Sequence, residues 1–215
     1  MSQNKTIAII GATGRTGKYV LSECLERGYA VRVLVRDASK IQPNDQITVI
    51  QGNVNAQQAL EELIKGADIL VSTLGAAKAS DAGIVQMSVK NILSVLNSSS
   101  DQPKYIHMSA FGLGDSKEQC KKSLLWRFIS SIGFKLIGQK LFDDMEVAES
   151  LVLASSGNFV VLRPSVLNEK PKQGYLVSGD KVGAMQISRL DVATFIVDMV
   201  ESSKYDKKAV SLFSA

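Results

Sequence analysis

The sequence predicts an α/β fold, a doubly wound parallel sheet built as a single domain. Short apolar runs rich in β-branched residues alternate with helical patterns of about 10–15 residues almost to the end of the chain, which is typical of βαβ units. Runs such as IAII, VLV and VVL are continuously apolar, as in strands buried on both faces. No repeat and no Pro- or Ser-rich linker divides the 215 residues, a length that suffices for one full core.

Each expected element follows from one of these runs. The expected strands are Thr6–Ile10, Ala30–Val35, Thr48–Gln51, Ile69–Thr73, Tyr105–Ser109 and Phe159–Arg163. The expected helices are Thr16–Arg27, Ala56–Lys65, Ile84–Leu96 and Leu141–Ser155. Between the fifth strand and the next helix, Gly112–Lys140 is too long for a simple connection, so we expect a lid-like insertion there.

Composition excludes several classes of protein. The hydrophobic content of 45% and the charged content of 21% are ordinary for a globular chain, and the net charge of +4 is too small to indicate a nucleic-acid partner. Cys24 and Cys120 are the only cysteines, so no disulfide framework is predicted, and with one histidine there is no Cys/His cluster for a metal. The apolar run near the N-terminus is too short for a signal peptide or a membrane span. We therefore expect a cytoplasmic protein without a metal.

The first strand leads into a glycine turn, GATGRTG, with glycines at Gly11, Gly14 and Gly17. The first glycine allows a sharp turn, the second allows a diphosphate to approach the backbone, and the third allows the next helix to pack against the strand. The helix, expected to start near Arg15, points free N–H groups and its positive end at the anion. Strand, turn, helix and second strand all occur, which predicts a dinucleotide site in a Rossmann-like domain; a purely structural turn is the alternative.

The end of the second strand indicates which dinucleotide binds. An acidic residue at this point would favour NAD, whereas the strand AVRVLVRD ends in Arg36, with Asp37 one step further. Arg15 lies inside the glycine turn, and two guanidinium groups can hold a 2′-phosphate through paired hydrogen bonds. The sequence thus favours NADP (NADPH). In the alternative interpretation, Arg36 is a solvated side chain and Asp37 contacts the ribose.

Motifs along nearly the whole chain resemble those of a known family. They are GATGRTG, VRVLVRD, QGNV, STLG, MSAFGLGD, LRPSVLNE and ISRLDVATFIVDMVESSKYDKKAV. Together they resemble the atypical short-chain dehydrogenase/reductases of the NmrA-like NAD(P)H-binding group. The SAF and ISRxD stretches are most like the flavin reductase, or biliverdin-IXβ reductase, branch of that group.

The resemblance implies a set of site residues. It places Asn53 and Val54 beside the adenine, Thr73–Gly75 beside the ribose and diphosphate, the Ser109 hydroxyl beside the nicotinamide, and Arg163–Ser165 at the nicotinamide end. The full set of expected cofactor contacts is Gly11, Thr13, Gly14, Arg15, Thr16, Gly17, Arg36, Asn53, Val54, Thr73, Leu74, Gly75, Ser109, Arg163, Pro164 and Ser165.

One part of the usual machinery is missing. Short-chain dehydrogenases use a Tyr-x-x-x-Lys pair as acid and base, and none of the five tyrosines here has a lysine four residues later. We therefore expect an NADPH-dependent reductase whose hydride acceptor is a flat conjugated small molecule: a flavin, a quinone or a tetrapyrrole. Ser109 is its expected catalytic residue, orienting the acceptor or nicotinamide by a hydrogen bond. The alternative is an NADP(H)-binding redox sensor or scaffold of the NmrA type, without turnover.

Two further features of the chain are His107 and the segment Gly112–Lys140. His107 lies in the fifth strand and is expected to be a packed residue, not a catalyst. The segment Gly112–Lys140, which includes Trp126, is dense in basic and apolar residues. It is interpreted first as a lid over the site at the carboxyl ends of the strands, then as a partner surface, and last as a membrane-surface helix. The chain is expected to be a monomer or a homodimer.

Overall fold

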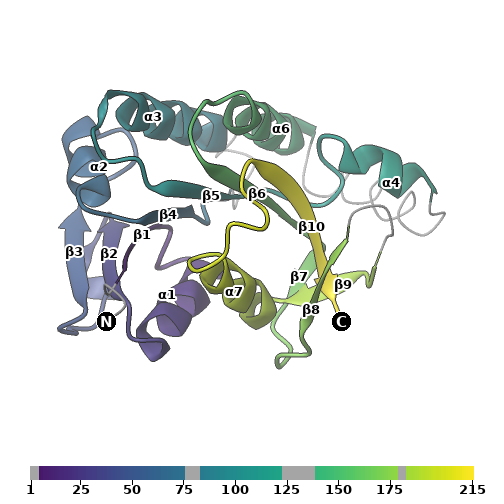
Figure 1. Cartoon of the computed structure of the whole chain (residues 1–215), viewed down its shortest axis with the longest axis horizontal. Helices are drawn as coiled ribbons and strands as arrows, with labels where there is room; N and C mark the ends of the chain where they lie inside the picture. The colour runs from purple at the N-terminus through teal and green to yellow at the C-terminus, as the bar shows by residue number, and fades with distance from the viewer. Residues whose placement is uncertain (1–4, 76–82, 123–138, 179–182) are drawn as a thin grey trace.

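The computed structural model describes residues 5–75, 83–122, 139–178 and 183–215, and these form an eight-stranded sheet with helices on both faces (Figure 1). The strand order is β3-β2-β1-β4-β5-β6-β10-β8, and only β8, at one edge, runs antiparallel to its neighbour. A second, two-stranded sheet pairs β7 with β9. The strands are β1 (Thr6–Ile10), β2 (Ala30–Val35), β3 (Ile47–Gln51), β4 (Ile69–Ser72), β5 (Lys104–Met108), β6 (Phe159–Pro164), β7 (Val166–Asn168), β8 (Tyr175–Ser178), β9 (Gln186–Ser188) and β10 (Lys208–Ser214). The predicted doubly wound parallel sheet is confirmed.

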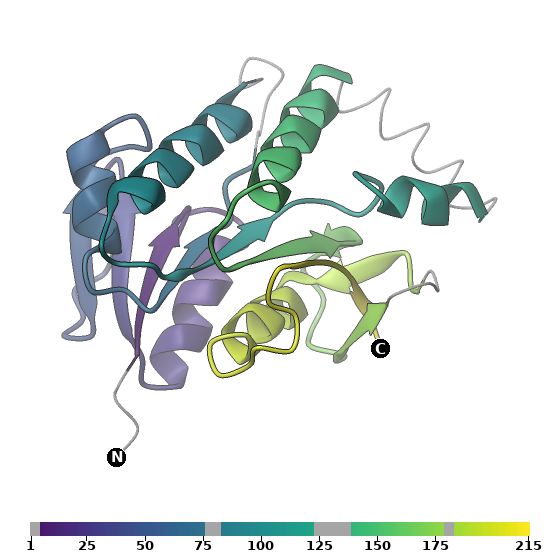
Figure 2. The ribbon, with the colours of Figure 1, turned by 45° about the horizontal axis from the view of Figure 1, so that its top comes forward.

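Helices cover both faces of this sheet, as Figures 1 and 2 show from two directions. One face carries α1 (Gly17–Glu26) and α7 (Arg189–Asp198), and the other carries α2 (Gln57–Ile64), α3 (Ile84–Ser98) and α6 (Gln139–Leu153). Two short helices, η1 (Ala38–Lys40) and α4 (Ser116–Lys122), follow β2 and β5. Successive side chains of β1 enter opposite cores, Ile7 and Ile9 on the α1 side and Ala8 and Ile10 on the α3 side.

The six strands and four helices expected from the sequence are all present, with ends within two residues of the expected positions. The sequence does not predict the strands β7, β8, β9 and β10, the helix α7, or the short helices η1 and α4. In α7 the run VATFIVD is buried on almost every side, so it lacks the polar face that would mark it as a helix.

A buried carboxylate fixes the position of α6. The helix α3 begins after Gly83, which has no side chain to cap it, and Asp144 of α6 accepts hydrogen bonds from the N–H groups of Val85 (3.1 Å) and Gln86 (2.9 Å) instead. Asp144 is only 3% exposed, so this capping bond ties the two helices together within the core. The position of α6 is important for the candidate site because this helix also carries Glu149, a residue of that site.

Candidate cofactor and active site

The glycine turn between β1 and α1 needs two of its three glycines for its own backbone. Gly11 has a φ of +88°, and its carbonyl accepts the N–H of Gly14 at 2.9 Å. A Cβ on Gly17 would lie closer than 3.0 Å to the Gly11 carbonyl oxygen and 2.8 Å from Thr73 Oγ1. A Cβ on Gly14 would meet only the Gly11 oxygen, at 3.0 Å, and Gly14 is exposed. The exposed face at Gly14 is therefore open to a ligand.

The N-terminus of α1 is free to receive an anion. The helix begins at Gly17, one residue after the start of the expected helix Thr16–Arg27, and its N-cap Thr16 forms no side-chain capping bond. No acidic residue lies in its first turn. The positive end of the helix and its N–H groups thus face the turn without a capping carboxylate, which fits a diphosphate.

Thr73 connects the turn to the neighbouring strand β4. Its N–H donates to the Ile10 carbonyl at 3.0 Å, and its Oγ1 donates to the carbonyls of Ile10 (3.3 Å) and Gly11 (3.4 Å). The strand order reverses between β1 and β4, the point where such sheets bind ligands. The structure thus brings the expected residues Thr73, Leu74 and Gly75 to the same edge as the turn.

At the end of β2, the side chains of Arg36 and Asp37 differ in whether another residue already binds them. Asp37 accepts hydrogen bonds from the N–H and Oγ of Ser39 (3.1 and 2.7 Å), which hold its pKa below the ordinary value. The exposed side chain of Arg36 makes no hydrogen bond or ion pair with any residue that the structure describes. The guanidinium, not the carboxylate, is therefore available to a ligand here.

The expected adenine residues follow β3. Asn53 is exposed, and its Oδ1 accepts the N–H of Asn55 at 2.8 Å, so the side chain shapes its own turn. Val54 is buried, and its carbonyl accepts a hydrogen bond from Asn91 Nδ2 at 2.9 Å. Both lie at the carboxyl edge of β3, next to the end of β2, since Gly52 N–H donates to the Val35 carbonyl at 2.8 Å.

Ser109, the first residue after β5, belongs to a buried polar network. Its Oγ donates to Glu149 Oε2 of α6 at 2.5 Å, and the same carboxylate accepts hydrogen bonds from Arg163. Arg163 also pairs with Asp115. Burial works to lower the pKa of Arg163, but the bonds and charges of Glu149 and Asp115 outweigh it and raise that pKa. The guanidinium of this expected cofactor residue is thus already held by two carboxylates.

Sequence reasoning missed Glu149. Its one signal is an acidic residue directly after Ala148, on the buried side of α6 with Leu141 and Val152. Beyond Arg163, Pro164 ends β6, and Ser165 follows it. The Oγ of Ser165 is buried without a hydrogen-bonding partner among the described residues, so a polar group of a ligand could satisfy it.

Arg15 points to a second charged group, centred on Glu169 just after β7. Glu169 accepts hydrogen bonds from Tyr19 Oη (2.8 Å) and Arg189 Nη1 (2.9 Å). Arg15 Nη2 lies 3.7 Å from Glu169 Oε1. Burial, followed by the nearby charge of Arg15, lowers the pKa of Arg189. The side chain of Arg15 is 76% exposed, so this contact with Glu169 is weak and Arg15 can turn to a ligand.

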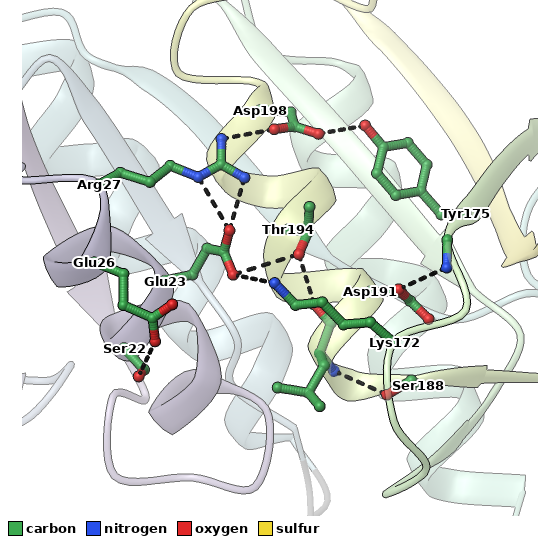
Figure 3. Close-up of polar contacts among 12 residues, drawn as sticks. Ser22, Glu23, Glu26, Arg27, Lys172, Tyr175, Ser188, Asp191, Thr194 and Asp198 are labelled. Carbon is green, nitrogen blue, oxygen red and sulfur yellow. Dashed lines mark hydrogen bonds and ion pairs between the residues drawn. The ribbon is translucent and has the colours of Figure 1, made fainter.

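The loop that carries Glu169 is fastened to α1 and α7 (Figure 3). Lys172 pairs with Glu23 of α1 at 2.6 Å, and Glu23 also pairs with Arg27, which reaches Asp198 of α7 at 2.7 Å. Burial works to raise the pKa of Glu23, but hydrogen bonds from Lys172 and Arg27 hold it below its ordinary value. Glu169 is thus presented beside the glycine turn by an anchored loop.

The remaining reactive side chains lie away from this edge or are inert. Burial raises the pKa of Cys24 to about 12 and that of Cys120 to about 11, so both are protonated thiols at neutral pH. His107 is fully buried, and burial lowers its pKa to about 4. Within the described residues no group of His, Cys, Asp and Glu could hold a metal. No helix in the described part of the chain is long and apolar enough to cross a membrane.

The segment Gly112–Lys140 is described only in part. Its first residues form the loop to α4 and that short helix, and its last residues begin α6. Residues 123–138, including Trp126, lie outside the described residues. The lid-like insertion therefore stays a prediction.

Comparisons with known proteins agree with this geometry. A family model described as NAD(P)H-binding matches residues 11–203. A short-chain dehydrogenase/reductase from Veillonella parvula, solved in complex with NADP, superposes with a TM-score of 0.77 at 19% identity and covers 98% of this chain and 94% of that one. ChuY, an anaerobilin reductase from Escherichia coli O157:H7, superposes with a TM-score of 0.79 at 20% identity, covering 98% and 97%.

Curated relatives match over a shorter stretch. An isoflavone reductase homolog A622-like protein from Nicotiana tabacum is 27% identical over 100 residues, 42% of this chain and 32% of that protein. The match thus spans about a third of the length of this relative.

The fold and its glycine turn define a Rossmann-like NAD(P)-binding protein. The chain belongs to the NAD(P)H-binding family, and its cofactor is NAD(P)H. The expected resemblance to an NAD(P)H-binding group is confirmed, and solved short-chain dehydrogenase/reductases share the fold.

Proposed function

We propose that this protein is an NADPH-dependent reductase that transfers a hydride to a flat conjugated small molecule at the carboxyl edge of β4, β5 and β6. The observation that carries the preference for NADPH is the contrast at the end of β2. Asp37 is occupied by Ser39, whereas Arg36 is exposed and has no partner among the described residues. A free guanidinium suits a 2′-phosphate, and Arg15, in the turn after the adjacent strand, is the second candidate contact.

The residues around the cofactor edge fit this proposal. The N-terminus of α1, which has no side-chain cap, and the exposed face at Gly14 suit the diphosphate. The hydroxyl of Ser165, which has no partner among the residues that the structure describes, suits a polar group at the nicotinamide end. The remaining expected contacts, Thr13, Asn53, Val54 and Thr73–Gly75, lie along the same edge. When bound, the reduced cofactor supplies the hydride, and the chain supplies binding and orientation.

The nature of the acceptor is inferred from what α6 presents to Ser109. Short-chain dehydrogenases place a tyrosine on this helix, whereas here the hydroxyl of Ser109 meets the carboxylate Glu149. Glu149 accepts hydrogen bonds and offers no proton to an alkoxide, so a conjugated acceptor that delocalises the added charge fits better than a ketone. ChuY, whose named substrate is anaerobilin, gives an example of such a reductase with this fold.

The same observation supports a second function, an NADP(H)-binding redox sensor of the NmrA type, because a sensor needs no acid. NADPH oxidation at 340 nm, measured with a panel of flavins, quinones and bilins, separates the two functions. We expect turnover with at least one class of acceptor. Tight NADPH binding without turnover across the panel would overturn the reductase and favour the sensor.

A further inference from the structure

Glu149 is the least exposed carboxylate in the described part of the chain, and it pairs with a buried arginine. Glu149 is 1% exposed and Arg163 is 3% exposed. The carboxylate accepts hydrogen bonds from Ser109 Oγ (2.5 Å), Arg163 Nη2 (2.5 Å) and Arg163 Nε (3.1 Å). A buried carboxylate with a guanidinium and a hydroxyl as partners has its charge and its lone pairs satisfied.

The surrounding backbone holds this network in one arrangement. Gly114 packs directly over it, with a φ of +54°, and a Cβ there would lie within 2.5 Å of Arg163 Nη2 and closer still to Glu149. Asp144, five residues before Glu149 on the same helix, caps α3 and fixes the position of α6. Ser109 itself is held by its N–H, which donates to the Leu162 carbonyl of β6 at 2.7 Å.

This arrangement determines what Ser109 can offer to a ligand. A serine hydroxyl carries one proton and two lone pairs, and Glu149, bonded to a guanidinium, acts only as an acceptor. The proton of Ser109 is therefore committed to Glu149. Ser109 is 4% exposed, and toward a ligand at this edge of the sheet its Oγ can accept a hydrogen bond but cannot donate one.

Resting on the proposed reductase function, we infer that Glu149 is a positioning residue that fixes Ser109 as a hydrogen-bond acceptor, and that the substrate therefore carries an N–H group at the edge that meets Ser109. A flavin has such a group in its imide, and a bilin has lactam and pyrrole N–H groups. A quinone has none. The geometry thus points to N–H-bearing heterocycles within the wider class of flat conjugated acceptors.

The test compares ligands that differ only in this N–H group. Riboflavin and N3-methylriboflavin are titrated against the full-length protein saturated with NADP⁺, and binding is followed by flavin fluorescence. We expect the wild type to bind riboflavin about tenfold more tightly, the effect of one hydrogen bond. Ser109→Ala and Glu149→Gln should bring this ratio close to one. In steady-state assays, Glu149→Gln should raise KM for riboflavin several-fold and leave KM for menadione unchanged.

Matched variants distinguish a positioning role of Glu149 from a general loss of structure. Glu146→Gln removes a carboxylate from the same helix that pairs with Lys117, away from Ser109, and should keep the wild-type ratio. Ser109→Ala retains the Glu149–Arg163 pair, so it tests the inference even where Glu149→Gln does not fold. The inference would be overturned if both Ser109→Ala and Glu149→Gln still bind riboflavin more tightly than N3-methylriboflavin. Equal binding of the two flavins to the wild type would also overturn it.

Other outcomes identify which proposal fails. A change in NADPH affinity in Ser109→Ala would assign the hydroxyl to the cofactor and overturn its assignment to the acceptor. Failure of the wild type to bind any flavin or bilin, or to oxidise NADPH with any acceptor, would overturn the proposed function itself.

Discussion

The single histidine makes the stability of this protein depend on pH in a way that can be calculated. His107 is fully buried in β5, and its Nε2 has no hydrogen-bonding partner among the described residues, while Nδ1 lies 3.2 Å from Tyr105 Oη. A protonated ring would place a charge and an unpaired N–H in the core. Burial therefore lowers the pKa of His107 to about 4, against about 6.5 in the unfolded chain.

The direction in which the free energy of unfolding changes with pH follows from which state binds the proton. Above pH 6.5 the ring is neutral in both states and has no effect on the pH dependence. As the pH falls from 6.5 toward 4, only the unfolded chain takes up the proton, so the free energy of unfolding decreases by about 1.4 kcal/mol per pH unit. The loss reaches about 2 kcal/mol at pH 5, or roughly 4–8 °C in Tm for a chain of this size.

Urea unfolding at pH 7.5 and pH 5.0 measures this loss, with any purification tag removed. His107→Asn keeps a polar group that does not titrate. Between pH 7.5 and pH 5.0 its free energy of unfolding should therefore decrease by about 2 kcal/mol less than that of the wild type. Val161→Ala removes packing at the β6 residue paired with His107 and changes no titrating group. Its free energy of unfolding should therefore decrease between the two pH values by as much as that of the wild type. An equal loss in His107→Asn and wild type, or a histidine NMR resonance that titrates near 6.5, would refute the reasoning.

Three predictions concern the cofactor edge. Gly14→Val should fold, as judged by its thermal transition, but lose NADPH binding, whereas Gly17→Val should lose the fold of the turn because its side chain has no space; normal binding by Gly14→Val would disprove the site. Arg36→Ala should weaken NADPH binding roughly ten- to a hundredfold and leave NADH binding within about twofold in fluorescence titrations, while the control Lys65→Ala changes neither. Glu169→Gln should tighten NADPH binding by about two- to fivefold, because Arg15 is released from a weak exposed pair; weaker binding would instead show that Glu169 orients the arginine.

The sequence was sufficient where local chemistry decides the structure. Gly11 and Gly17 could be assigned because a tight turn against a strand has no space for a Cβ, and apolar runs marked the central strands. It was insufficient where burial is set by distant elements. The helix α7 is apolar almost all round because it lies between the sheet, α1 and β9, and nothing in its own sequence indicates that position.

The same limit explains what was missed at the site. Ser109 was singled out because the family resemblance places a hydroxyl at the end of this predicted strand. Glu149 lies 40 residues away along the chain, and only the packing of α6 brings it to the serine. Equally, Arg163 was correctly placed at the end of β6, but its pairing with Glu149 and Asp115 depends on three separate elements.

This network leads to a last prediction, on the pH dependence of catalysis. A tyrosine–lysine pair gives a rate that varies with pH as the phenol titrates. Here Ser109 does not titrate, its proton is held by Glu149, and the pKa of Arg163 is raised above an already high value. Burial keeps His107 neutral and the two thiols protonated at neutral pH. We therefore expect kcat, measured with saturating NADPH and acceptor, to stay constant within about twofold from pH 6.5 to 8.5, since the reduced acceptor takes its proton from water. A tenfold change across this range, with an apparent pKa near 7 that persists in Ser109→Ala, would reveal an acid or base elsewhere and contradict catalysis by orientation alone.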